Sequence, residues 1–114
     1  MRLLQKIKLA IPTEGSDGLE DTVSEVFGRA KTFTIVKIRN NSINSLKIMD
    51  NPAVSYKHGA GPIVVKTLVD MGVTVVAARE FGPGASALLG HHNVKRFTVK
   101  PGIKVTEAVQ NIIK

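Results

Sequence analysis

The sequence predicts a mixed α/β fold whose sheet is antiparallel in its first half and parallel in its second. In the first half, two strand-like segments flank Asn40-Asn41, a pair that tolerates the left-handed backbone angles of a tight hairpin turn. In the second half, strand-like and helix-like segments alternate, which is typical of right-handed parallel crossovers. With 114 residues, 43% of them hydrophobic, the chain suffices for one domain with a core, residues 1–114.

The first half begins with a predicted strand over residues 6–12, where the early alternation indicates one face more buried than the other. An exposed loop follows over residues 13–18. Residues 19–27 are expected to hold a short helical turn, because Val23, Val26 and Phe27 share one helical face. Residues 32–39 and 42–49 are the strands of an antiparallel N-terminal hairpin, and residues 50–57 form a connecting loop.

The second half is organised around the sequence His-Gly-Ala-Gly-Pro at residues 58–62, which leads into the apolar segment 63–71. Glycine permits positive φ and close backbone approach, and proline suits the first turn of a helix. The loop is therefore interpreted as a helix entrance. Gly72 ends this helix, and the β-branched run at residues 73–78 predicts a buried parallel strand.

A second loop of the same design, residues 81–85, is expected to open a second helix that begins after Pro83 and ends at Gly90. Another strand is predicted over residues 94–99. The C-terminal segment is predicted to be an amphipathic helix packed on the sheet, because one helical face carries Val105, Ala108, Val109, Ile112 and Ile113.

Three loops are expected to meet in one crevice, because ligands in such sheets bind at the carboxyl ends of the parallel strands. The first N–H groups of a helix lack acceptors within that helix and lie at the positive end of its dipole, so both glycine loops favour an anion. The candidate ligand-binding residues are Pro12, Thr13, Arg29, His58, Gly59, Gly61, Gly82, Pro83 and Gly84.

His58 is also the candidate metal ligand, because neutral imidazole binds metals and protonated imidazole attracts anions. The alternative is a structural role in which His58 hydrogen-bonds the loop. Arg29 has two open roles as well, since it either pairs with an anion or caps the sheet. His91-His92 is interpreted as a surface turn, because adjacent side chains generally point in different directions.

Composition limits the classes of function. The chain has no cysteine, which excludes a disulfide framework and a metal held by thiolates of this chain alone. The net charge of +7 favours polyanions, acidic partners or anionic small molecules. Lys6 and Lys8 interrupt the apolar residues near the start, and no later apolar run is long enough to span a membrane. We therefore expect a cytoplasmic protein that makes no membrane contact.

Four segments together carry a resemblance to a known family: Ile-Pro-Thr at residues 11–13, Val-Phe-Gly-Arg-Ala-Lys-Thr-Phe at 26–33, His-Gly-Ala-Gly at 58–61, and Phe-Gly-Pro-Gly-Ala at 81–85. In this order and spacing, the chain resembles the dinitrogenase iron-molybdenum cofactor biosynthesis domain family over nearly its whole length. Members of this family often carry a small residue where this chain has Arg79. The arginine adds a large cation beside the expected crevice.

The resemblance implies a ribonuclease-H-like α/β fold. It also implies a non-enzymatic, NifX-like carrier whose transient cargo is an iron-sulfur or iron-molybdenum cluster precursor, with cofactor-assembly proteins as partners. Because the chain offers no cysteine, such a cargo would be held weakly and would be exchangeable.

The ribonuclease-H-like architecture raises nuclease chemistry as an alternative, but two-metal cleavage needs clustered carboxylates. Asp17, Glu20 and Asp21 are expected in one exposed loop and Asp50 in another, and no other catalytic motif stands out. An enzyme is therefore unsupported. The remaining alternative is a basic nucleic-acid-binding module, although only 4% of the residues are aromatic and no basic run alternates with stacking side chains.

Overall fold

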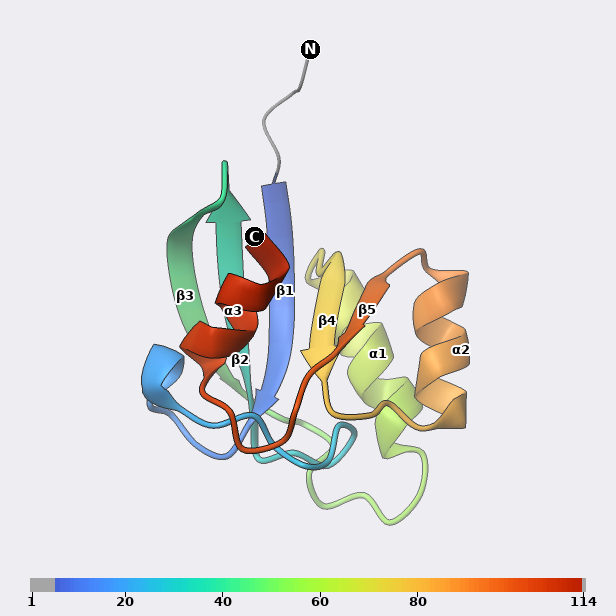
Figure 1. Cartoon of the computed structure of the whole chain (residues 1–114). Coiled ribbons are helices and arrows are strands. Elements are labelled where there is room, and N and C mark those ends of the chain that lie inside the picture. Colours follow the sequence, from blue (N-terminus) through green and yellow to red (C-terminus); the bar gives the residue numbers. More distant parts are fainter. Residues whose placement is uncertain (1–5, 114) are drawn as a thin grey trace.

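The computed structural model describes residues 6–113 and shows a five-stranded mixed sheet with helices on both faces (Figure 1). The strands lie in the order β3-β2-β1-β4-β5. Their bounds are β1 Lys6–Thr13, β2 Thr32–Arg39, β3 Ser42–Asp50, β4 Val75–Ala78 and β5 Lys95–Thr98. The helices are α1 Ala60–Asp70, α2 Pro83–His91 and α3 Val105–Ile113, with one turn of 3-10 helix, η1, at Gly18–Glu20.

Strand β1 is where the sheet changes from antiparallel to parallel pairing. β1 pairs antiparallel with β2 and β2 antiparallel with β3, whereas β4 pairs parallel with both β1 and β5. The turn between β2 and β3 lies at Asn40 and Asn41, where the sequence predicts it, and both residues have positive φ, 54° and 65°. The antiparallel part is larger than a hairpin, because β1 adds a third strand to it.

Two hydrophobic cores, one on each face, hold the layers together. Helices α1 and α2 cover the face that buries Ala10 of β1 and Ile35 of β2. Helix α3 covers the other face, which buries Leu9 and Val36 of the same two strands. Adjacent residues of β1 thus enter different cores, as expected of a strand buried on both faces. On α3 the buried residues follow the predicted amphipathic spacing and are Val105, Ala108 and Val109.

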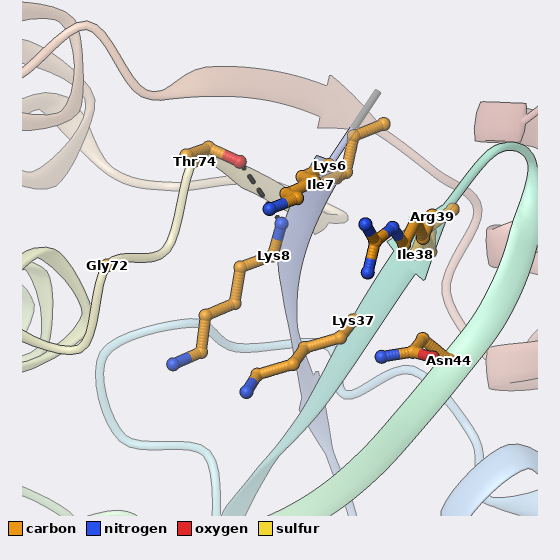
Figure 2. Close-up of a pocket in the computed structure, with 9 residues that line it drawn as sticks. All are labelled: Lys6, Ile7, Lys8, Lys37, Ile38, Arg39, Asn44, Gly72 and Thr74. Carbon is orange, nitrogen blue, oxygen red and sulfur yellow. Dashed lines mark hydrogen bonds between the residues drawn. The ribbon is translucent and has the colours of Figure 1, made fainter. Parts of the chain in front are cut away.

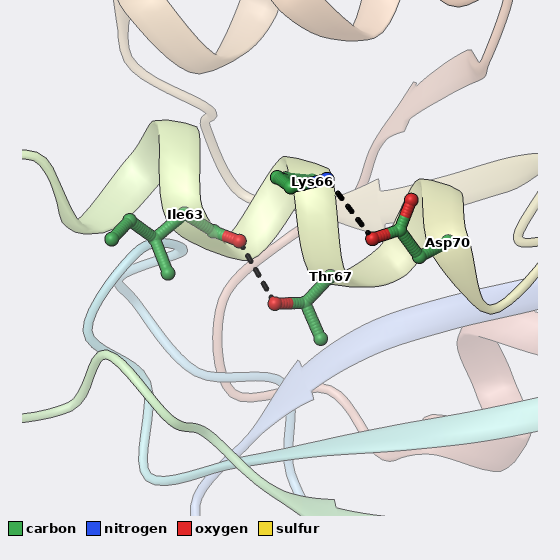
Figure 3. A network of polar contacts seen from close by, with 4 residues as sticks. All are labelled: Ile63, Lys66, Thr67 and Asp70. Atoms are coloured by element: carbon green, nitrogen blue, oxygen red, sulfur yellow. Dashed lines mark hydrogen bonds and ion pairs between the residues drawn. The ribbon is translucent and has the colours of Figure 1, made fainter.

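The outward face of α1 carries an exposed ion pair and a threonine (Figure 3). Lys66 Nζ lies 3.2 Å from Asp70 Oδ2, and the Thr67 hydroxyl donates a hydrogen bond of 2.9 Å to the Ile63 carbonyl. Both charged side chains are exposed, so this pair contributes little to stability. None of the helices in the described part of the chain is long and apolar enough to cross a membrane.

The predicted helical turn at residues 19–27 is wrong, because only Gly18–Glu20 is helical. The carboxylate of Asp21, predicted to be exposed, is buried and accepts backbone hydrogen bonds from Gly15, Asp17 and Thr22. Such local side-chain bonds to the backbone compete with a continued helix. Asp21 therefore organises its own loop.

The chain after η1 joins the α3 side of the molecule. The backbone N–H of Val23 donates to the Ile103 carbonyl at 2.8 Å, and Glu20 pairs with Lys104 at 2.8 Å. The hydrogen bond from Lys104 to the Glu20 carboxylate, together with the negative charge of Glu20, raises the pKa of Lys104 above its usual value. Val23 is buried while Val26 is 51% exposed, so these residues share no helical face.

The end of α2 also differs from the prediction. The helix runs through Gly90 to His91, and the left-handed residue that follows it is Asn93, with φ of 60°. Asparagine is the residue that most often replaces glycine in this conformation. Gly90 lies instead against Arg96, whose Nη2 would be 3.4 Å from a Cβ at this position.

Candidate functional site

The two glycine-rich loops meet at the carboxyl ends of β1 and β4, at the lower edge of the sheet in Figure 1. A cavity of about 370 Å³ lies there, which we call the loop cleft. Three segments line it, namely residues 26–29, 60–62 and 80–84.

Two helices begin at this cleft. Helix α1 starts after Gly59, with φ of 74°, and α2 starts after Gly82, with φ of 77°. Within the described part of the chain, neither helix start receives a hydrogen bond from a capping side chain. The amides of Ala60 and Gly61 in α1 and of Gly84 in α2 have no acceptor within their helices and lie beside the positive ends of two dipoles. The loop cleft therefore has backbone groups that attract anions.

Close backbone packing brings the three segments together. A Cβ added at Gly28 would lie 2.9 Å from the backbone nitrogen of Gly61, and a Cβ at Gly61 would lie 3.3 Å from Cβ of Ala85. Larger side chains at these positions would separate the 26–29 loop from α1, and α1 from α2. The glycines therefore set the width of the cleft.

A buried asparagine supports this packing from behind. Asn51 Nδ2 donates to the carbonyls of Gly28 at 2.9 Å and Ala30 at 2.8 Å, and Oδ1 accepts the Ala53 N–H at 2.8 Å. One side chain thus ties the 26–30 loop to the segment that follows β3. The role of Asn51 could not be predicted from the sequence, because an Asn-Pro pair at a strand end indicates only a turn.

The wall of the cleft combines apolar and charged groups. Phe27 makes edge-to-face contacts with Phe33 and Phe81, with ring centroids 5.5 Å apart in both pairs. Arg29 lines the cleft and is exposed, and so is Glu80, which pairs with Arg79 at 3.4 Å. Arg79, which the sequence places beside the expected crevice, is not among the lining residues and instead offsets the charge of Glu80.

The structure brings together five of the nine candidate ligand-binding residues. Those that line the loop cleft are Arg29, Gly61, Gly82, Pro83 and Gly84. Gly59 lies just outside as the residue that precedes α1, and His58 before it is exposed.

Pro12 and Thr13 do not line the cleft, because the end of β1 is covered. The hydroxyl of Thr13 is buried and shares hydrogen bonds with the hydroxyls of Thr32 at 2.7 Å and Thr34 at 3.0 Å. The carbonyl of Pro12 accepts the Ser24 N–H at 2.8 Å. These contacts make the end of β1 a structural support, and only two of the three loops expected at the crevice reach it, together with the 26–29 segment.

The side chains that are chemically able to bind a metal do not converge on the loop cleft in the described part of the chain. Among residues 6–113, no three histidine, aspartate or glutamate side chains are grouped so that they could hold a metal ion. His91 and His92 are exposed at the end of α2, with ring centroids 5.1 Å apart. The groups that line the loop cleft are suited to electrostatic and apolar contact with a ligand.

Known proteins share this fold. The apo form of the orange protein from Desulfovibrio gigas superposes with a TM-score of 0.81 and 29% identity, over 93% of this chain and 86% of that one. TM1290 from Thermotoga gives a TM-score of 0.75 with 32% identity, also over 93% and 86%.

Sequence comparison gives the family. The uncharacterized protein MJ0580 of Methanocaldococcus jannaschii is 32% identical over 79 residues, which are 69% of this chain but only 63% of that protein. The model of the dinitrogenase iron-molybdenum cofactor family matches residues 6–114. The chain therefore belongs to the dinitrogenase iron-molybdenum cofactor family.

Proposed function

We propose that this protein is a small non-enzymatic carrier in the cytoplasm that binds an anionic metal cluster, or another compact anionic ligand, in the loop cleft. The observation that carries the proposal is that α1 and α2 both begin at one cavity without capping side chains. Family membership supports an iron-sulfur or iron-molybdenum cluster precursor as the transient cargo, with cofactor-assembly proteins as partners.

The cleft would hold such a cargo by noncovalent contacts with the outer atoms of the cluster. Backbone amides and Arg29 supply positive potential, while Phe81 and Val26 offer apolar contact to the sulfides of a cluster. The chain has no thiolate to replace those sulfides, so the cargo would exchange readily. The structure of the orange protein is that of its apo form, and this term is used for a protein that also binds a ligand. The name therefore supports ligand binding by this fold.

We also infer that the sheet is of the ribonuclease-H-like type. Three antiparallel strands followed by two parallel ones, with β1 at the junction, support this assignment. The buried, hydrogen-bonded carboxylate of Asp21 weighs against nuclease chemistry on this sheet, because it already accepts three backbone N–H groups.

The proposal is tested by placing a negative charge at the start of α2. A Cβ at Gly84 would meet no atom within 4 Å, so a side chain can begin there without a close contact, and an acidic residue in the first turn stabilises a helix. We expect this variant to fold at least as stably as the parent but to bind tetrathiomolybdate, a molybdenum-sulfur dianion, about tenfold more weakly. Binding is measured by anaerobic titration followed by amide NMR.

The matched control is Ala87→Glu, which adds the same charge to an exposed position of α2 outside the cleft. Molybdate serves as a second control, because it has the same charge without sulfur. Equal binding of tetrathiomolybdate by the parent and by Gly84→Glu would overturn the proposal.

His58 remains the proposed metal ligand, at the rim of the cleft before Gly59. If its imidazole coordinates the cargo, His58→Ala will bind a synthetic iron-sulfur cluster about tenfold more weakly than the parent, a loss expected for one ligand or its orientation. His91→Ala, at the far end of α2, is the control. Equal cluster affinity for the parent and His58→Ala, with circular dichroism unchanged, would remove His58 from the site.

A further inference from the structure

Four cations share one face of the sheet at the end opposite the loop cleft. Lys6 and Lys8 of β1 lie directly opposite Arg39 and Lys37 of β2. Opposed residues of an antiparallel pair, and residues two apart on one strand, lie on the same face. This is the face that α1 covers farther along the strands. We call the four residues the basic ladder.

The basic ladder lines a pocket of about 350 Å³ (Figure 2). Lys8 and Lys37 extend side by side from neighbouring strands, and Asn44, Gly72 and Thr74 complete much of the rim. None of the nine described residues that line the pocket is acidic. Its volume lies in the range of roughly 300–1,000 Å³ that is usual for small-ligand sites.

Two features hold the shape of this pocket. The backbone N–H of Lys8 donates to Thr74 Oγ1 at 3.2 Å, and its Nζ donates to the Met71 carbonyl at the end of α1 at 2.6 Å. One wall of the pocket is therefore anchored to the turn between α1 and β4.

The opposite wall contains a β-bulge. Lys37 pairs with Ser45 and Ile38 pairs with Ile43, so Asn44 of β3 is left between the two pairs. A bulge changes the direction of a side chain and is common beside binding sites. Here the bulged residue, Asn44, is itself one of the residues that line the pocket.

The charges of the basic ladder work against folding. Like charges directly opposite each other on paired strands are destabilising. The ion pairs in the part of the chain that the structure describes are Lys66–Asp70, Arg79–Glu80 and Lys104–Glu20, and none of them neutralises the ladder. An anion held between β1 and β2 would remove this repulsion.

We propose that the basic ladder binds a compact polyanion made of linked phosphates, such as inorganic tripolyphosphate or the triphosphate of a nucleotide. Cations opposite each other and two residues apart lie roughly 5–7 Å from their neighbours at the backbone, so several can contact successive phosphates. The described lining has no aromatic residue on which the bases of a single-stranded nucleic acid could stack. This site is distinct from the loop cleft.

The test is calorimetric titration of the whole chain with tripolyphosphate and with ATP, at low salt and without divalent cations. We expect Lys37→Gln/Arg39→Gln to lose at least about tenfold in affinity for both, because hydrogen bonds to charged groups are the stronger ones. The control Lys31→Gln/Lys100→Gln removes the same charge from exposed positions outside this pocket and should bind as the parent does. Tighter binding of ATP than of tripolyphosphate would identify a nucleotide as the source of the phosphates, and equal binding would identify the phosphate chain itself.

Thermal unfolding supplies a second readout. Tripolyphosphate should raise the Tm of the parent and of the control Lys31→Gln/Lys100→Gln, but not that of Lys37→Gln/Arg39→Gln. Equal loss of affinity in the ladder variant and the control would overturn the proposal in favour of diffuse attraction to net charge. So would binding of a single-stranded oligonucleotide that tripolyphosphate does not displace.

Discussion

The two ends of the sheet attract anions by different physical means. At the loop cleft, positive potential comes from the backbone at the starts of α1 and α2, and glycines bring these backbones together. At the basic ladder, it comes from long side chains on β1 and β2. The loop cleft depends on the close packing of buried groups. The basic ladder depends on the register of β1 and β2 and needs little close packing. Mutations that disturb packing should therefore affect the loop cleft far more than the basic ladder.

The largest expected difference between the two ends concerns their asparagines. Asn51→Ala removes three hydrogen bonds from a buried side chain and leaves the carbonyls of Gly28 and Ala30 without this partner. We expect this variant to lose about 2–4 kcal/mol of unfolding free energy. Asn44→Ala, at the exposed bulge of the ladder pocket, should change it by less than about 0.5 kcal/mol. Urea denaturation measures the free energy of unfolding of both variants. Equal losses would contradict the claim that the loop cleft depends on packing more than the basic ladder does.

A smaller effect is expected from two glycines of the loop cleft. Gly28→Ala places a Cβ 2.9 Å from the Gly61 nitrogen, so backbone must shift, and we expect a loss of about 1–3 kcal/mol. Gly84→Ala adds the same methyl group where nothing lies within 4 Å, and should gain about 0.5–1 kcal/mol because alanine restricts the unfolded chain. If both substitutions have the same sign, close packing does not set the width of the cleft.

The loop cleft could be predicted in part because its signals are local. Each of the segments 58–62 and 81–85 contains, in consecutive residues, the glycines and proline that predict the start of a helix. Both helices begin where they were expected. The turn at Asn40-Asn41 is local in the same sense. The strands and helices that follow these signals were predicted to within a few residues.

What the sequence did not reveal depends on contacts between distant residues. Val23 has the spacing of a helical residue, but its backbone pairs with Thr13 and Ile103. Thr13 was predicted as the first residue of an exposed loop, yet it is the buried last residue of β1 and hydrogen-bonds with threonine hydroxyls of β2. Neither partner can be identified from local pattern. The basic ladder is hidden for the same reason, because its two halves are separated by a loop and align only through the register of β1 and β2.

The smallest expected effect belongs to the basic ladder and has the opposite sign. Lys37→Glu would convert the like-charged pair with Lys8 into an oppositely charged one across β1 and β2. Such pairs are worth about 0.2–1 kcal/mol, so we expect a gain of roughly 0.5 kcal/mol in the free energy of unfolding at low salt. The gain should shrink in 1 M salt, because both side chains are reached by solvent and are screened there. Lys100→Glu makes the same change of net charge at an exposed position outside the sheet and is the control. A gain of the same size in both variants would mean that the overall positive charge, rather than the opposed cations of the ladder, opposes folding. A gain confined to Lys37→Glu would show that the register of β1 and β2 places repulsion at this end of the sheet, which a bound polyanion would relieve.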